Sequence, residues 1–92
     1  MELRFLKAAR RDLGEIWDHT AANWGVDQAD RYLDGLERSF ATLADMPEIA
    51  RERDEFSPPV RIHPTGPHLI VYRVEDQIVV VVRILASRRN WR

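Results

Sequence analysis

Cysteine is absent from this 92-residue chain, and no hydrophobic run is long. Without cysteine the protein has no disulfide framework, no thiolate zinc ligand and no cysteine nucleophile. This fits a reducing compartment. The longest apolar run, Ile78 to Val82, is far too short to cross a bilayer, and charged residues interrupt the first seventeen residues too often for a signal peptide. We therefore expect a cytoplasmic protein with no membrane contact.

Lysine is nearly missing as well, because Lys7 is the single lysine among 14 basic residues. Arginine suits bidentate contacts with carboxylate or phosphate, although biased codon usage produces the same composition. The charge is unevenly distributed along the chain. Residues 1–50 carry six basic and ten acidic residues, whereas residues 51–92 carry eight and five. The basic half ends in the tail "SRRNWR", which is either a solvated terminus or the edge of a binding surface.

Hydrophobic residues make up 45% of the chain and charged residues 32%, which is typical of one small globular domain spanning residues 1–92. The first half has helical periodicity. A stripe with helical spacing runs through Ala9, Leu13, Ile16, Trp17, Thr20, Ala21 and Trp24, and Gly25 ends it. Trp17 and Trp24 are expected in the core. A second stripe follows through Ala29, Leu33, Leu36, Phe40 and Leu43, with Asp27 as the expected N-cap and Pro47 as the stop.

The remaining segments have strand character. Strands are expected at "ELRFL", "VRIH", "HLIVYRV" and "IVVVVRILA", and residues 47–59 are expected to form a loop. The last strand is apolar on both alternating sides, so it should be central. The predicted fold is α+β with the order β-α-α-β-β-β. A helical hairpin packs on one face of a mostly antiparallel four-stranded sheet, and nothing in the sequence remains to cover the other face.

Strand alternation predicts which side chains share that open face. Pairing Val74 with Ile78 across a three-residue turn places one set there: Leu69, Val71, Arg73, Val79, Val81, Arg83 and Leu85. The other set faces the helices: Ile70, Tyr72, Val74, Val80, Val82 and Ile84. Arg61 and His63 are expected to join Arg73 and Arg83. A two-residue turn would break this assignment. An apolar surface rimmed by arginine suits a protein partner or phosphates.

Enzymatic sites are poorly represented. His19, His63 and His68 are the only histidines, and no acid accompanies the latter two at metal-ligand spacing. Ser39 and Ser57 have no glycine elbow nearby, and the chain has no phosphate-cradling loop. We expect no metal and no cofactor.

Four stretches together resemble the ParE branch of the RelE/ParE toxin superfamily: "AARRDLGEIWDHTAANWG", "ADRYLDGLERSFATLADMPEIARERDEF", "VRIHPTGPHLIVYRVED" and "RILASRRNW". The resemblance extends from about Phe5 to Trp91. It implies the toxin of a type II toxin–antitoxin module, neutralised by a cognate ParD-like antitoxin. RelE-like members cut messenger RNA in the ribosome, whereas ParE-like members poison DNA gyrase.

Comparison with the RelE pattern disfavours the nuclease. Its lysine pair falls at Arg61 and His63, and an early strand arginine falls near Leu69, where it is lost. Only the arginine after the last strand, at Arg88, is kept. Attack by a 2′-hydroxyl needs a base, a charge stabiliser and a leaving-group acid together. His63 and His68 leave the nuclease open as an alternative, and a non-toxic protein-binding module is another.

The preferred hypothesis is therefore a gyrase poison that acts by binding, without catalytic residues. The resemblance implies contact with operator DNA only through the antitoxin. The expected target-binding residues are Arg61, His63, Arg73, Arg83, Arg88, Arg89 and Trp91. The expected antitoxin-binding residues are Leu3, Phe5, Val71, Val79, Val81 and Leu85, with "ELRFL" as the likeliest sheet edge and "VRIH" as the other.

Overall fold

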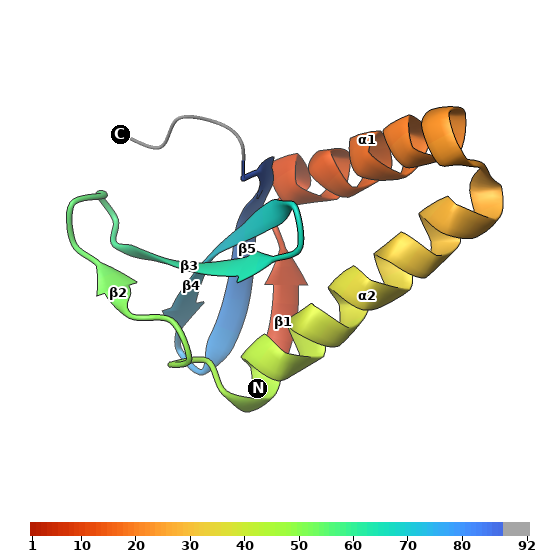
Figure 1. The fold of residues 1–92 in the computed structure, drawn as a ribbon. Helices are drawn as coiled ribbons and strands as arrows, with labels where there is room; N and C mark the ends of the chain where they lie inside the picture. Colours follow the sequence, from red (N-terminus) through yellow and green to blue (C-terminus); the bar gives the residue numbers. More distant parts are fainter. Residues whose placement is uncertain (88–92) are drawn as a thin grey trace.

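The computed structural model describes residues 1–87 and contains a five-stranded sheet with two helices on one face (Figure 1). The elements follow in the order β1 (Glu2–Phe5), α1 (Lys7–Trp24), α2 (Val26–Asp45), β2 (Glu52–Arg53), β3 (Val60–Thr65), β4 (His68–Glu75) and β5 (Ile78–Ala86). The strand order is β1-β5-β4-β3-β2, with β1 parallel to β5 and the other pairs antiparallel.

The predicted α+β class and element order are confirmed. Strand β5 lies between β1 and β4, as its two-sided apolar pattern predicts. The sheet has one strand more than predicted, because Glu52 and Arg53 in the expected loop pair with Arg61 and Val60. The edges of the sheet are therefore β1 and the two-residue β2, which covers only the start of β3.

The helices form the predicted antiparallel hairpin, which reaches well beyond the sheet (Figure 1). Gly25 joins them with φ 94° and ψ 162°. Because α2 already begins at Val26, Asp27 lies in its first turn and the prediction of an Asp27 N-cap is wrong. At this far end Trp24 is 74% exposed, so its prediction as a core residue is wrong too. Trp17 is half-buried and donates a hydrogen bond from Nε1 to Asp30 Oδ1 at 2.9 Å.

The core lies between the helices and the covered face of β1, β5 and β4. Its buried members are Ala9, Leu36, Phe40, Leu43, Ile70, Tyr72, Val79, Val81 and Ile84. Leu3 and Phe5 pack against this cluster from β1. The Phe5 and Phe40 rings meet edge to face with centroids 4.9 Å apart, which is a favourable aromatic geometry.

The turn between β4 and β5 differs from the prediction. It has two residues, Asp76 and Gln77, both with positive φ, so Glu75 pairs with Ile78 and Val74 with Val79. This register turns Val79 and Val81 toward the helices, where both are 0% exposed. Their predicted place on the open face is wrong, because the shorter turn shifts β5 by one residue.

A β-bulge then restores the predicted assignment of faces in the second half of β5. Tyr72 pairs with Val81 and Val71 with Arg83, which leaves Val82 as the extra residue. Beyond the bulge Ile84 is buried in the core, while Arg83 and Leu85 lie opposite Val71 and Leu69 on the open face. The prediction is right for these residues because the bulge cancels the error in turn length. Val80 and Val82, assigned to the helices, lie on the open side instead.

Candidate functional site

The open face of the sheet carries a groove of about 290 Å³, which we call the open-face groove. Its lining is apolar apart from Ser57, Arg73 and Arg83, and comprises Phe56, Pro58, Val60, Ile62, Val71, Val82 and Leu85. The sequence suggested that nothing covers this face. In the structure Phe56, Ser57 and Pro58, which precede β3, form one wall, and the Ser57–Pro58 peptide bond is cis. The groove therefore has an apolar floor, a loop wall and two arginines.

Arg73 supplies the first cation of the open-face groove. Its Nε lies 3.1 Å from Glu75 Oε2, an ion pair between neighbours on the same strand face. This contact does not have the geometry of a hydrogen bond, so the buried Arg73 Nε has no hydrogen-bond partner within residues 1–87. Burying such a donor unpaired costs free energy. Arg73 is thus held by the Glu75 ion pair, and its side chain is 23% exposed.

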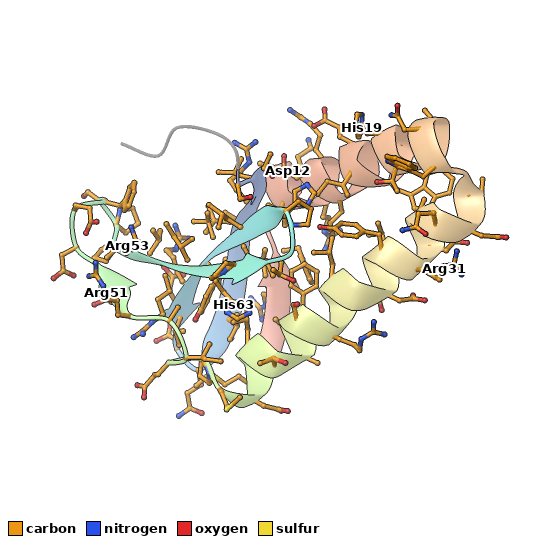
Figure 2. The ribbon with its side chains drawn as sticks, in the orientation of Figure 1. Asp12, His19, Arg31, Arg51, Arg53 and His63 are labelled. Carbon is orange, nitrogen blue, oxygen red and sulfur yellow. The ribbon has the colours of Figure 1, made fainter. Side chains whose placement is uncertain are left out.

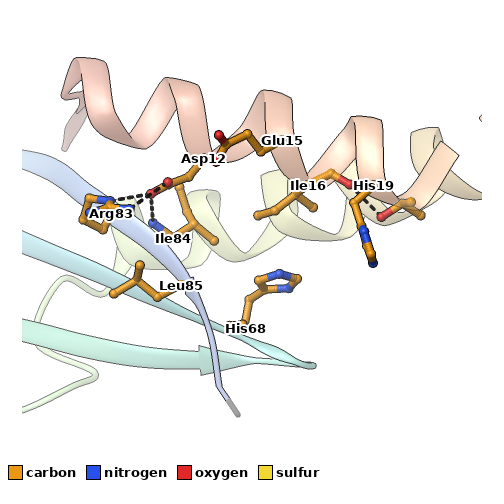
Figure 3. Close-up of a pocket in the computed structure, with 10 residues that line it drawn as sticks. Asp12, Glu15, Ile16, His19, His68, Arg83, Ile84 and Leu85 are labelled. Carbon is orange, nitrogen blue, oxygen red and sulfur yellow. Dashed lines mark hydrogen bonds and ion pairs between the residues drawn. The ribbon is translucent and has the colours of Figure 1, made fainter. Parts of the chain in front are cut away.

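Arg83 supplies the second cation, and α1 holds it in place. Asp12 accepts hydrogen bonds from Arg83 Nε at 2.7 Å and from Nη2 at 3.0 Å (Figure 3). The same carboxylate accepts a third hydrogen bond from the Ile84 backbone N–H at 2.9 Å. The hydrogen bonds to Asp12 raise the pKa of Arg83, so the guanidinium stays charged. The Arg83 side chain is still 45% exposed.

Arg61 and His63 do not join these arginines. Arg61 pairs with Tyr72 and His63 with Ile70, and both partners face the helices. Ile62 between them lines the open-face groove. The prediction that Arg61 and His63 share a face with Arg73 and Arg83 is therefore wrong. Both residues pair with residues of β4 that face the helices, so they lie on the helix side of the sheet. Arg61 instead donates a short hydrogen bond from Nη1 to the Ala50 carbonyl, which holds the loop before β2.

A second groove, of about 690 Å³, lies between α1 and the C-terminal half of β5, and we call it the helix-side groove. His19 from α1 and His68 from β4 line it (Figure 3). His68 Nδ1 lies 2.5 Å from the Tyr32 hydroxyl of α2, and burial lowers the pKa of His68 and raises that of Tyr32. Within residues 1–87 no group of three or more acids and histidines could hold a metal ion.

The side chains expected to bind an antitoxin divide into two groups. Val71 and Leu85 line the open-face groove as predicted. Leu3, Phe5, Val79 and Val81 point into the core instead. Because the side chains of Leu3 and Phe5 pack in the core, a partner at the edge strand β1 would contact its backbone. Arg88, Arg89 and Trp91 lie outside the described residues.

Sequence reasoning missed Asp12 and the loop wall. Asp12 is 6% exposed, although an acid in an amphipathic helix is expected on the polar side. Its spacing carried a signal: it lies three residues after Ala9 and four before Ile16, on the apolar stripe, where an acid needs a partner. Figure 2 shows Asp12 at the sheet end of α1, whereas His19 lies nearer the hairpin tip. The position of Phe56 over the sheet had no comparable signal.

Comparison with known proteins identifies the family. The model of the ParE toxin of the type II toxin–antitoxin system parDE matches residues 3–91. The chain belongs to the ParE toxin family. Toxin ParE1 of Mycobacterium tuberculosis is 42% identical over 93 residues, covering 98% of this chain and 95% of that protein. Toxin ParE3 of Caulobacter vibrioides is 32% identical, covering 86% and 79%.

A solved structure has the same fold. The chromosomal ParDE system from P. aeruginosa contains a chain that superposes with a TM-score of 0.81 at 23% identity, covering 94% of this chain and 95% of that one. The shared fold is a helical hairpin on a mixed sheet. Its family membership makes this protein a ParE-type toxin of a type II toxin–antitoxin system. Within residues 1–87 no helix has the length and apolar character needed to cross a membrane.

Proposed function

We propose that this ParE-family toxin inhibits DNA gyrase by binding it and is neutralised by a cognate ParD-like antitoxin. The observation that carries the proposal is the open-face groove, an apolar floor flanked by Arg73 and Arg83. Arginine beside an apolar centre is the composition of protein-binding surfaces. Family membership supports the toxin role.

A binding mechanism is favoured over ribonuclease chemistry because the candidate groups are separated. Arg73 and Arg83 line the open face, whereas His63 and His68 follow the helix-side alternation of Ile70. His68 is also occupied by the Tyr32 hydroxyl. A general acid–base pair must reach the same reacting atoms as the charge stabiliser. His68 and Arg83 both line the helix-side groove, but the sheet separates Arg73 from both histidines. A base, an acid and a charge stabiliser therefore do not converge on one site, and the proposed mechanism needs no catalytic residue.

The antitoxin is expected to use two surfaces of the sheet. A segment that is disordered when free folds into the open-face groove and places apolar side chains on Val71 and Leu85. An added strand can pair with the outer edge of β1, which has no partner among residues 1–87. Operator DNA is then contacted through the antitoxin only.

The target-binding edge is proposed to comprise Arg73 and Arg83 with Arg88, Arg89 and Trp91 of the tail. The first two line the groove, and the chain leaves β5 after Ala86, which lines the helix-side groove beside Arg83. The arginines supply charge for acidic groups of gyrase. Arg61 and His63 are left out of this edge because they face the other way.

Induction in a bacterial host separates the function classes. A gyrase poison produces DNA breaks and an SOS response while translation continues. A ribosomal nuclease depletes messenger RNA and stops translation first, and a non-toxic binding module does neither. Following growth, RNA integrity and DNA breaks after induction therefore tests the proposal, and messenger RNA loss with intact DNA would overturn it.

Co-expression with the neighbouring gene tests the antitoxin. The expected result is a stable complex whose mass exceeds that of the toxin alone. Recovery of the toxin alone from cells that contain both proteins would count against the partner.

A further inference from the structure

We infer that Asp12 is a positioning residue that orients Arg83 toward the target. This rests on the proposed function, in which Arg83 belongs to the target-binding edge. The geometry alone gives Asp12 two tasks, and they can be separated. One is to accept the Ile84 backbone N–H, and the other is to hold the Arg83 guanidinium.

The first task arises where β1 ends. The parallel pairing of β1 with β5 stops at Phe5 and Val81, and the Leu6 N–H to Val81 carbonyl bond of 2.9 Å closes it. Beyond that point the outer edge of β5 has no strand beside it within residues 1–87. The Ile84 N–H points there, and Asp12 accepts its hydrogen bond from α1 (Figure 3). A neutral acceptor such as asparagine can perform this task equally well.

The second task explains why the acceptor is a carboxylate. A carboxylate with 7% side-chain exposure pays a desolvation cost that a neutral acceptor avoids. The Arg83 partner is 45% exposed, so solvent screens part of the attraction that offsets this cost. The pair is bidentate, and its two charge-assisted hydrogen bonds fix the guanidinium plane. The carboxylate therefore orients the arginine in addition to accepting the Ile84 N–H.

The fixed guanidinium keeps donors for a partner. Arg83 bonds Asp12 through Nε and Nη2, so Nη1 has no hydrogen bond within residues 1–87. Because of the bulge at Val82, Arg83 lines both the open-face groove and the helix-side groove. An arginine held in place loses less conformational entropy when it binds a carboxylate or phosphate. Asp12 thus prepares Arg83 for an anionic group without touching that group.

A double-mutant cycle tests the inference with purified toxin and DNA gyrase. Asp12→Asn keeps an acceptor for Ile84 and removes the charge. It should raise the toxin concentration that half-inhibits gyrase by about tenfold. In an Arg83→Ala background the same change should alter half-inhibition by less than about twofold, because Asp12 acts through Arg83.

A matched control and a second variant complete the test. Asp18→Asn makes the same change at an exposed acid of α1 that does not line the helix-side groove, and it should leave inhibition unchanged. If Asp12→Asn fails to fold, Arg83→Lys replaces it, because lysine keeps the charge but cannot form the bidentate pair. It should fold and inhibit about tenfold less well.

The outcomes are distinguishable from failure of the proposed function. An equal loss from Asp12→Asn in both backgrounds, or full inhibition by Arg83→Lys, would overturn the positioning role while gyrase inhibition by the wild type stands. Wild-type protein that neither inhibits gyrase nor arrests growth would overturn the proposed function, and this inference with it.

Discussion

Tyr32 and His68 link α2 to the start of β4, since the hydroxyl and Nδ1 lie 2.5 Å apart. Their rings are also in contact, with centroids 5.5 Å apart. We expect Tyr32→Phe to keep the ring contact and lose the hydrogen bond, lowering the free energy of unfolding by about 1 kcal/mol. Urea unfolding of both proteins measures the difference. An unchanged midpoint and slope would show that the bond does not contribute.

His68 also predicts a dependence of stability on pH. Burial lowers its pKa in the folded state below the ordinary value of 6.5. Above that value both states hold a neutral imidazole and the stabilisation is complete. As the pH falls below it, the unfolded chain takes up a proton that the folded chain resists, so the free energy of unfolding decreases until the pH passes the lowered folded pKa.

The corresponding measurement is urea unfolding at several pH values between about 7 and about 5, a range that brackets the ordinary pKa of histidine. His68→Gln removes this imidazole, so its stability should fall less steeply with decreasing pH than that of the wild type. Parallel curves for the two proteins would contradict the assignment. Acids that titrate in both proteins cancel in the comparison.

At the scale of elements, the helical hairpin depends on one backbone conformation. Gly25 has φ 94° and ψ 162°, a region that residues with a Cβ avoid. Gly25→Ala should therefore lower the free energy of unfolding by about 1–3 kcal/mol. Gly14, inside α1, is the matched control, because an added Cβ meets nothing within 4 Å there.

Gly14→Ala should raise the free energy of unfolding by about 0.5–1 kcal/mol, since alanine is the better helix former. Opposite signs for the two substitutions are the expected result in thermal or urea unfolding. A loss of similar size at both positions would mean that the substitutions act through something other than backbone conformation.

Sequence patterns predicted the elements better than their register. The stripes ending at Gly25 and Pro47 located both helices, because amphipathic periodicity spans many residues. Which strand face is covered depends on a single residue in a turn. The pair Asp76–Gln77 lacks the glycine that marks most two-residue hairpins, so the sequence did not reveal it. The bulge at Val82 lies within a run of valines, so the sequence did not reveal its position either.

The same limits applied to the candidate site. Arg73 and Arg83 were recognisable as charges inside apolar strands, and both line the open-face groove. Arg61 and His63 were misplaced because a residue's face in β3 is set by its pairing with β4. The Asp12–Arg83 pair joins residues 71 positions apart, and local patterns do not report contacts of that range.

At the scale of the whole molecule, the two faces of the sheet have different tasks. One face is filled by the helical hairpin and holds the fold together (Figure 1). The other carries the open-face groove with Arg73 and Arg83. This division predicts that changes in the groove affect partner binding more than stability.

Arg73→Ala tests that division. The substitution removes a buried donor that has no hydrogen-bond partner within residues 1–87 and breaks only an ion pair with the exposed Glu75. We expect the free energy of unfolding to change by less than about 1 kcal/mol. Affinity for gyrase should fall by about tenfold or more, since the partner's anionic group loses its arginine. Urea unfolding and gyrase titration measure the two effects, and a large loss of stability with unchanged inhibition would contradict the division.

Gyrase-mediated DNA cleavage in a purified system is the decisive test of whether the toxin poisons gyrase. Supercoiled plasmid, gyrase and ATP are incubated with the toxin, and linear DNA is measured after protein digestion. We expect linear DNA that appears only when gyrase and toxin are both present, and that is not formed when the antitoxin is added first. Unchanged plasmid, together with cleavage of messenger RNA on ribosomes by the same preparation, would contradict this expectation.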